Sequence, residues 1–242
     1  DAAQRKLDDV PEDAESLTEE AYRRQEYDAL RAGRGGPGTE LLVRVLEPSR
    51  FRDPVASYFS RVCLVRKLRE TRVLAGFTRL IPPEGESAPD LIQPLRSGRT
   101  QDWLPAMIVR GEGVFLEFNP DRIESWTQRD DVRQRTAQMS DAFNKRRVDR
   151  GQPARRVTPE LVAIHTLAHL LINQLAFDCG YGSASIRERL YCETSPGANP
   201  MHGLLLYTAS GDAEGTMGGL VRQGEPGRFE TTMERALREA LW

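Results

Sequence analysis

The longest apolar stretch of the chain lies between Pro159 and Asp178, where 12 of the 20 residues are hydrophobic. These residues fall on every side of a helix rather than on one stripe, a pattern typical of a helix that is buried on most of its surface. Thr158 stands at the N-cap position, and Gly180 stands where a left-handed C-cap would end the helix. The pattern therefore predicts a core helix over residues 159–178.

The segment after this helix predicts a second one. Ser185 and Glu188 have the spacing of a capping box, in which each side chain bonds the backbone of the other residue at a helix start. A tight turn through Tyr181 and Gly182 would join the two helices. We therefore expect a helical hairpin whose first arm is buried.

Shorter apolar runs predict strands at Leu41–Val45, Tyr58–Val65 and Gly203–Ala209. Residues 67–83 suit an extended, half-buried segment that is broken by Gly76 and stopped by two prolines. Its apolar positions are Val73, Leu74, Phe77, Leu80 and Ile81.

A β-hairpin is predicted between Trp103 and Phe118. The apolar runs Ala106–Val109 and Val114–Phe118 flank the sequence RGEG, a short loop whose glycines permit positive φ. A turn is favoured over a phosphate-binding loop, since glycines alone are weak support for the latter.

Three further helices are predicted. One lies near Glu15–Leu30, and another closes the chain over Phe229–Trp242. The third begins at the N-cap Asn119 and runs to about Arg147. Its inward face would consist of Ile123, Trp126, Val132, Met139 and Phe143.

These elements predict an α/β fold, or a mixed α+β fold, in which a small sheet packs on the helical hairpin. Residues 1–55 would form a charged helix and a glycine-rich linker, and residues 56–242 the main domain. The chain begins with Asp1 rather than Met, which is expected of a fragment.

A basic segment interrupts a chain whose formal net charge is only −2. Between residues 144 and 157 six cations face one acid, Asp149, so this segment could contact phosphates. A solvated linker before the core helix is the alternative, and both interpretations stay open. The six residues are Lys145, Arg146, Arg147, Arg150, Arg155 and Arg156.

His165 and His169 project from the same face of the core helix because they are four residues apart. Histidines at this spacing can ligate a metal, as in HExxH enzymes, but the catalytic glutamate of that motif is missing here. A metal also needs a third protein ligand. We therefore favour two hydrogen-bonded histidines that hold the helix against a neighbour, and a metal-dependent hydrolase remains the alternative.

The glycine-rich sequence SGDAEGTMGGL follows the strand at 203–209 directly. Loops at such strand ends often carry the sites of α/β folds, and Asp212 and Glu214 could hold a cation. The sequence lacks the Lys-Ser/Thr pair of a P-loop, so nucleotide binding is not supported. A tight connector is favoured.

The cysteines and the lack of a hydrophobic leader indicate a cytoplasmic protein. The three cysteines form no CxxC pair, and an odd number without secretory context favours reduced thiols. The core helix carries two histidines, Asn173 and Gln174, so we expect no membrane span.

Several stretches together resemble one family. HTLAHLLINQLAFDCGYGSASIRERLY and LLLYTASGDAEGTMGGLV resemble the helicase-associated, zinc-binding domain at the C-terminus of MrfA-type repair helicases and DrmB-like proteins. LRETRVLAGFTRL and WLPAMIVRGEGVFLEF resemble the DrmB-like subunits of the DISARM anti-phage defence system specifically. The resemblance covers most of residues 60–242.

The resemblance implies a non-catalytic subunit that works with a DrmA-like helicase on DNA, with any ATPase activity in the partner. The alternative that it leaves open is an accessory domain of a DNA-repair helicase. It also implies zinc for the full-length protein, at four cysteines beyond the segment ALREALW, so we assign no metal ligand within residues 1–242.

The family motif falls on positions for which the resemblance implies no chemical role. From the residues themselves we expect Arg187 or Arg189 to pair with Asp212 or Glu214. The motif positions are His165, His169, Gly180, Tyr181, Ser185, Arg187, Glu188, Arg189, Tyr191, Gly211, Asp212, Glu214, Gly215, Gly218 and Gly219.

Overall fold

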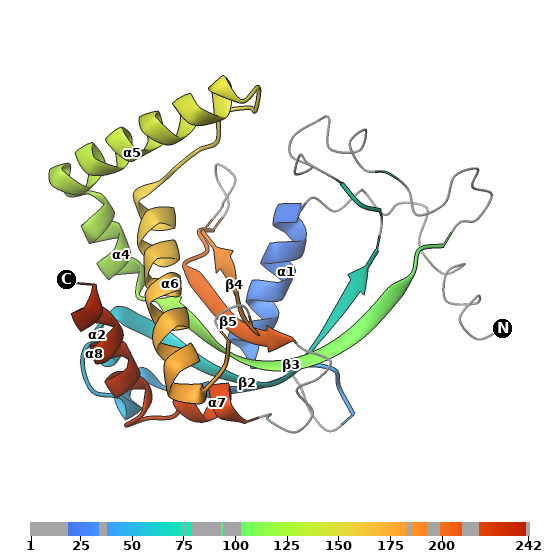
Figure 1. Cartoon of the computed structure of the whole chain (residues 1–242). Helices are drawn as coiled ribbons and strands as arrows, with labels where there is room; N and C mark the ends of the chain where they lie inside the picture. The colour runs from blue at the N-terminus through green and yellow to red at the C-terminus, as the bar shows by residue number, and fades with distance from the viewer. Residues whose placement is uncertain are drawn as a thin grey trace.

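The centre of the molecule is a five-stranded antiparallel sheet with the strand order β1-β2-β3-β5-β4. The computed structural model describes residues 19–33, 38–74, 76–78, 93, 103–182, 185–192, 199–209 and 218–240. Figure 1 shows β2 and β3 as long strands that continue beyond the rest of the sheet. The strands are β1 (Leu42–Leu46), β2 (Phe59–Val73), β3 (Ala106–Phe118), β4 (Ile186–Tyr191) and β5 (Gly203–Ala209).

Helices cover both faces of this sheet, so the predicted mixed α+β fold is confirmed. Helix α1 (Glu19–Ala32) packs on one face, while α6 (Pro159–Cys179), α7 (Gly219–Gln223) and α8 (Phe229–Glu239) pack on the other (Figure 1). The remaining helices are η2 (Pro48–Arg50), α2 (Val55–Tyr58), α4 (Pro120–Thr127) and α5 (Asp130–Asp149).

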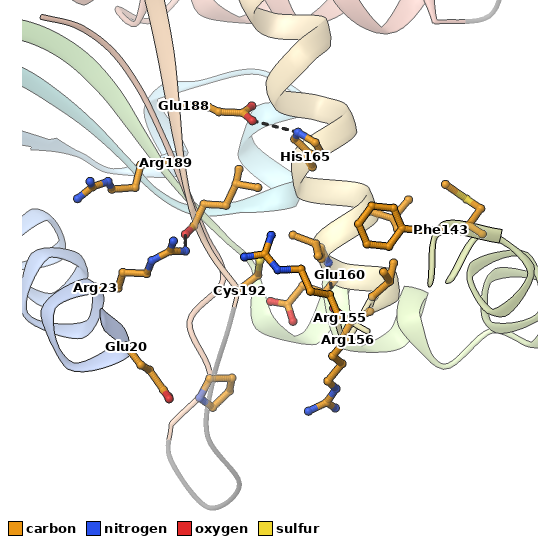
Figure 2. Close-up of a pocket in the computed structure, with 17 residues that line it drawn as sticks. Glu20, Arg23, Phe143, Arg155, Arg156, Glu160, His165, Glu188, Arg189 and Cys192 are labelled. Atoms are coloured by element: carbon orange, nitrogen blue, oxygen red, sulfur yellow. Dashed lines mark hydrogen bonds and ion pairs between the residues drawn. The ribbon is translucent and has the colours of Figure 1, made fainter. Parts of the chain in front are cut away.

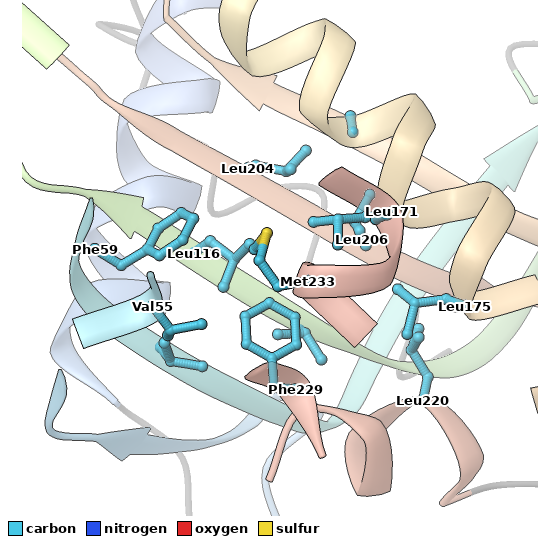
Figure 3. Packing of buried hydrophobic residues seen from close by; sticks show 14 of the residues in the cluster. Val55, Phe59, Leu116, Leu171, Leu175, Leu204, Leu206, Leu220, Phe229 and Met233 are labelled. Atoms are coloured by element: carbon cyan, nitrogen blue, oxygen red, sulfur yellow. The ribbon is translucent and has the colours of Figure 1, made fainter. Parts of the chain in front are cut away.

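Alternation along the strands divides the core into two apolar clusters, because successive side chains point to opposite faces of a sheet. In β5, Leu204 and Leu206 face α6 and α8, whereas Leu205 and Tyr207 face α1. Figure 3 shows the first cluster, in which strand leucines meet Leu171 and Leu175 of α6 and Phe229 and Met233 of α8. Burial on both faces explains why β5, with the sequence GLLLYTA, is almost continuously apolar.

Helix α6 has the predicted ends but not the predicted burial. The Thr158 side chain accepts a hydrogen bond from the Leu161 amide at 3.1 Å, and Gly180 adopts a left-handed φ of 71°. Only one side of the helix is covered, however, and Phe177 on the other side is 82% exposed. Burial on most of the surface was therefore a wrong prediction, because the sheet and α8 reach the helix from one side.

Of the helices that the structure describes, α6 has the length and hydropathy to cross a membrane. Its apolar side, with Ile164, Ala168 and Leu171, packs in the first cluster. Its other side carries the exposed His165 and His169. These features are those of the core helix of a globular fold.

The predicted second helix of the hairpin is wrong, since Ile186–Tyr191 forms strand β4. The Ser185 amide donates to the Gly182 carbonyl at 2.8 Å, which closes a turn instead of starting a helix. IRERLY has three consecutive charged residues between Ile186 and Leu190, so it shows no clear period of two, and the pairing with β5 decides in favour of the strand.

The predicted β-hairpin at 103–118 is also wrong, because both runs and the RGEG sequence belong to the single strand β3. The glycines allow close contact rather than a reversal of direction. A Cβ atom on Gly113 would lie 2.5 Å from the Leu206 carbonyl oxygen of β5. The facing strand β2 changes register between Val65 and Leu68, opposite these glycines.

The helix predicted from Asn119 to Arg147 is two helices, α4 and α5. The Asn119 cap is confirmed, because its side chain accepts from the Arg122 amide at 3.3 Å. The predicted inward face is wrong in part, and its members Trp126 and Val132 are half-buried. Ile123 is buried, but Met139 and Phe143 are each 43% exposed, since α5 extends away from the sheet (Figure 1).

The strands predicted at Leu41–Val45, Tyr58–Val65 and Gly203–Ala209 are confirmed as β1, the first part of β2, and β5. Residues 67–73 continue β2, after which Leu74 and Phe77 are exposed rather than half-buried. Leu80 and Ile81 lie outside the described residues.

The N-terminal part of the chain contacts the same sheet. Tyr27 and Leu30 of α1 are buried in the second cluster, and β1 pairs with β2. The division of the chain at residue 55 stays a prediction.

Candidate functional site

His165 and His169 lie next to a carboxylate on the exposed side of α6. Their Nε2 atoms are 2.9 Å apart, and Glu188 Oε1 lies 3.0 Å from the first and 3.9 Å from the second. Figure 2 shows Glu188 reaching from β4 toward His165. These three side chains, which we call the His-His-Glu cluster, are the one group of three or more potential metal ligands among the described residues.

The alternation of β4 places Glu188 in this cluster. Ile186 and Leu190, two residues to either side, pack against the α6 side of the sheet, whereas Tyr191 packs on the α1 side. Glu188 therefore faces α6, and a helix at this position would not have produced the same contact. The geometry agrees with the favoured interpretation, in which hydrogen-bonded histidines join α6 to a neighbour, and it also supplies a third potential ligand.

The two arginines of the motif point to the other face and have carboxylate partners there. Arg187 donates to Glu70 at 3.1 Å and Arg189 to Glu26 of α1 at 2.7 Å. The predicted partners, Asp212 and Glu214, lie outside the described residues together with Gly211 and Gly215. The pairing of the arginines with that loop remains a prediction.

Tyr191 is a buried structural residue. Its ring lies 5.5 Å from the ring of Tyr27 and 5.8 Å from that of Phe115, measured between centroids. Burial raises the pKa of the Tyr191 hydroxyl well above its ordinary value, so the group stays protonated at neutral pH.

The glycines at the end of the motif position a short helix on the sheet. The backbone amides of Gly218 and Leu220 donate to the two carboxylate oxygens of Glu112, at 2.6 and 2.8 Å. A Cβ on Gly219 would lie 2.7 Å from the Tyr181 hydroxyl oxygen. These amides are thus bonded to a carboxylate of the chain itself. Sequence reasoning missed Glu112, because its partners lie more than 100 residues away.

One cation of the basic segment, Arg147, is buried and has a structural hydrogen bond. Arg147 is only 8% exposed, and its Nε donates to the Pro153 carbonyl at 2.8 Å. The other five side chains are exposed and form no ion pair with any residue in the described part of the chain: Lys145, Arg146, Arg150, Arg155 and Arg156.

Part of this segment borders a cleft that also reaches the His-His-Glu cluster. The cleft has a volume of about 1010 Å³, and Arg155, Arg156, Glu160, His165 and Glu188 are among the residues that line it (Figure 2). The Asn144 side chain fixes this wall by bonding both the amide and the carbonyl of Arg155, at 2.8 and 3.0 Å. The structure thus brings the two predicted site regions to one cleft.

The C-terminal part of the chain matches a known family. Residues 167–241 match the MrfA Zn-binding domain family. The residues present do not fit a four-cysteine zinc site, because the chain holds only three cysteines. Burial raises the pKa of the Cys63 thiol to about 12 and that of Cys179 to about 11, which disfavours the thiolate that a metal would need.

A curated protein matches a larger part of the chain. The DISARM protein DrmB of Bacillus paralicheniformis is 38% identical over 193 residues, which are 78% of this chain and 34% of that protein. The chain thus spans about a third of the length of this relative. The predicted resemblance is confirmed, and over these residues the chain is DrmB-like, with a C-terminal segment of the MrfA Zn-binding domain type.

Proposed function

We propose that this chain belongs to a non-catalytic subunit of a bacterial anti-phage complex of the DISARM type, which acts in the cytoplasm with a DrmA-like helicase and helps it to engage foreign DNA. The identity with the DISARM protein DrmB is the observation that carries the proposal. The exposed cations at 145–156 support the part that concerns DNA.

Phosphate contacts would come from the five exposed cations of this segment, while Arg147 would hold the segment in shape. Cations without a carboxylate partner can release the counterions of DNA, which makes binding favourable and dependent on salt. The side chain of Arg147 is directed to Pro153 instead, so its removal would disturb the loop rather than subtract one phosphate contact.

Fluorescence anisotropy of labelled single-stranded and duplex DNA tests the proposal, with this chain alone and with its helicase partner, at two salt concentrations. We expect binding that weakens with salt. The double substitution Arg146→Ala and Arg150→Ala should reduce the slope of log K against log salt by about 2 for duplex DNA, if each cation contacts one phosphate.

The matched control is the double substitution Arg133→Ala and Arg135→Ala, which removes the same charge from exposed positions of α5. These residues lie about 11 to 17 positions before Arg146 and Arg150, or roughly 17 to 25 Å along a helix, which is beyond the Debye length of about 8 Å at physiological salt. An equal loss in both double variants would contradict a local contact site. No effect of the chain on DNA binding, alone or with the helicase, would refute the proposal.

The alternative of an accessory domain of a DNA-repair helicase is favoured by one observation, the match of residues 167–241 to the MrfA Zn-binding domain family. The two functions differ in their covalent arrangement. RecA-type motor motifs in the same polypeptide would support the repair helicase, and a motor on a separate subunit would support the defence complex.

A further inference from the structure

We propose that the His-His-Glu cluster binds a divalent transition-metal ion such as Zn²⁺, which joins α6 to β4. This site differs from the four-cysteine site that the family implies, because its ligands are His165, His169 and Glu188. The inference does not depend on DNA binding or on the helicase.

The distances within the cluster are short enough for one metal ion to contact all three ligand atoms. The three atoms form a triangle with sides of 2.9, 3.0 and 3.9 Å. The circle through these atoms has a radius of about 2.0 Å, so an ion slightly above their plane would lie at the usual Zn–N and Zn–O distances of about 2.0–2.2 Å from all three. The separations are unequal, so small rotations of the side chains would bring the three ligand atoms to tetrahedral positions around the ion.

The chemistry of the ligands agrees with this geometry. Two imidazole nitrogens and one carboxylate oxygen suit zinc and similar transition metals, whereas magnesium and calcium prefer oxygen ligands alone. Three protein ligands leave one coordination position open, as in zinc sites that bind water or substrate. Because His165 and Glu188 also line the cleft, the cluster is in contact with that space.

The carboxylate of Glu188 supplies a second, independent observation. Its Oε2 atom is buried and has no hydrogen-bond partner. Among the described residues, the two histidines are the only basic side chains within ion-pair distance of this carboxylate. A buried carboxylate oxygen without a partner is unfavourable, and a cation at the cluster would compensate its charge.

A hydrogen-bonded cluster without metal is the competing interpretation. In that case one imidazole donates to the other, and Glu188 accepts from His165. The two interpretations differ in a measurable way, since only the first predicts a bound ion whose stoichiometry depends on all three residues.

The decisive experiment is the metal content of the purified protein, together with Zn²⁺ titration by calorimetry after treatment with a chelator. We expect the wild type to bind one more Zn²⁺ per chain than His169→Ala or Glu188→Gln. Loss of a ligand should weaken binding by more than the roughly 10- to 100-fold that is typical when a residue that only hydrogen-bonds a ligand is changed. Because the zinc content of each variant is subtracted from that of the wild type, zinc bound at any other site does not affect the result.

His202→Gln is the matched control. His202 also contacts a carboxylate, that of Glu160, but it has no second imidazole beside it among the described residues. We expect this variant to bind Zn²⁺ like the wild type. Equal stoichiometry in the wild type and both cluster variants would overturn the proposal, as would an equal loss in His202→Gln.

Co²⁺ substitution identifies the ligand type. We expect the difference spectrum between the wild type and His169→Ala to show d–d absorption without a thiolate charge-transfer band, and a thiolate band in this difference would assign the lost ion to cysteine and refute the site. Both histidines are exposed and alanine favours helices, so His169→Ala should fold. If the circular dichroism of His169→Ala differs from that of the wild type, the Zn²⁺ stoichiometry of Glu188→Gln alone tests the proposal.

Discussion

The carboxylate of Glu112 offers a sharp test of how the fold is held together, through the substitution Glu112→Gln. This side chain is 2% exposed and accepts one backbone amide on each oxygen, from Gly218 at 2.6 Å and from Leu220 at 2.8 Å. A glutamine has one oxygen and one NH₂ group, so either orientation places a donor against a donor. The variant therefore loses one of the two bonds, and either the buried Leu220 amide or the partly buried Gly218 amide is left without this acceptor.

The expected loss of unfolding free energy is about 2–3 kcal/mol, since a hydrogen bond to a charged group contributes about 1.5–3 kcal/mol. Glu40→Gln is the control, because Glu40 is 40% exposed and contacts Lys67 and Arg110 only through surface ion pairs of 3.5 and 3.3 Å. Such exposed pairs are screened by solvent and contribute little to stability.

Urea unfolding at neutral pH, followed by circular dichroism, measures both variants. Hydrogen exchange at the Leu220 amide should also become faster in Glu112→Gln, because this amide loses or weakens its acceptor. The reasoning is refuted if the two variants differ by less than about 0.5 kcal/mol, a difference that lies within the usual range for surface substitutions.

Three further predictions concern the sheet, a thiol and a helix cap. Gly113→Ala should lower the unfolding free energy by about 1–3 kcal/mol, because its Cβ would lie 2.5 Å from the Leu206 carbonyl oxygen. Gly182→Ala is the control and should have little effect, since the nearest contact of its Cβ is 3.6 Å. Equal losses of the two variants in urea unfolding would contradict this prediction. Burial raises the folded-state pKa of the Cys63 thiol to about 12, above the ordinary 9.0. The stability that the neutral, buried thiol contributes is therefore fully present below pH 9 and is lost as pH rises from 9 toward 12. Between pH 8 and pH 10 the wild type should lose about 1 kcal/mol more than Cys63→Ala, and equal slopes in urea unfolding against pH would refute the effect. Thr158→Ala should lose about 1 kcal/mol, because the side chain caps α6 through a 3.1 Å hydrogen bond, and an unchanged urea midpoint would contradict the role of the cap.

Local signals in the sequence were sufficient for elements that depend on local contacts. The ends of α6 followed from Thr158 and Gly180, since caps are interactions within a few residues. The second helix failed because the Ser185 and Glu188 spacing fits a capping box locally, while the pairing with β5 selects a strand. Propensity and spacing cannot include a partner strand that lies farther along the chain.

The RGEG sequence failed for a related reason. Glycine permits both a turn and the close approach of a neighbouring backbone, and the sequence does not distinguish these uses. The contact of Gly113 with Leu206 depends on the order of the strands in the sheet.

The candidate site could be predicted in part. The spacing of His165 and His169 was sufficient to place both on one face of a helix. Their third neighbour, Glu188, required the strand alternation of β4 and the packing of β4 beside α6, neither of which is visible in the spacing. Among the cations, the sequence could not separate Arg147 from its exposed neighbours, because its burial depends on the turn at Pro153.

The strand order has a consequence for the segment that matches the MrfA Zn-binding domain. Residues 167–241 contain β4 and β5, which pair with each other. The strand on the other side of β5 is β3, which comes from residues 106–118. If the segment were cut out alone, the edge of β5 would have no strand to pair with, and α7 would lose the carboxylate of Glu112. The segment that matches the sequence family is therefore smaller than the sheet into which it folds, and residues upstream of it supply the missing strand and carboxylate.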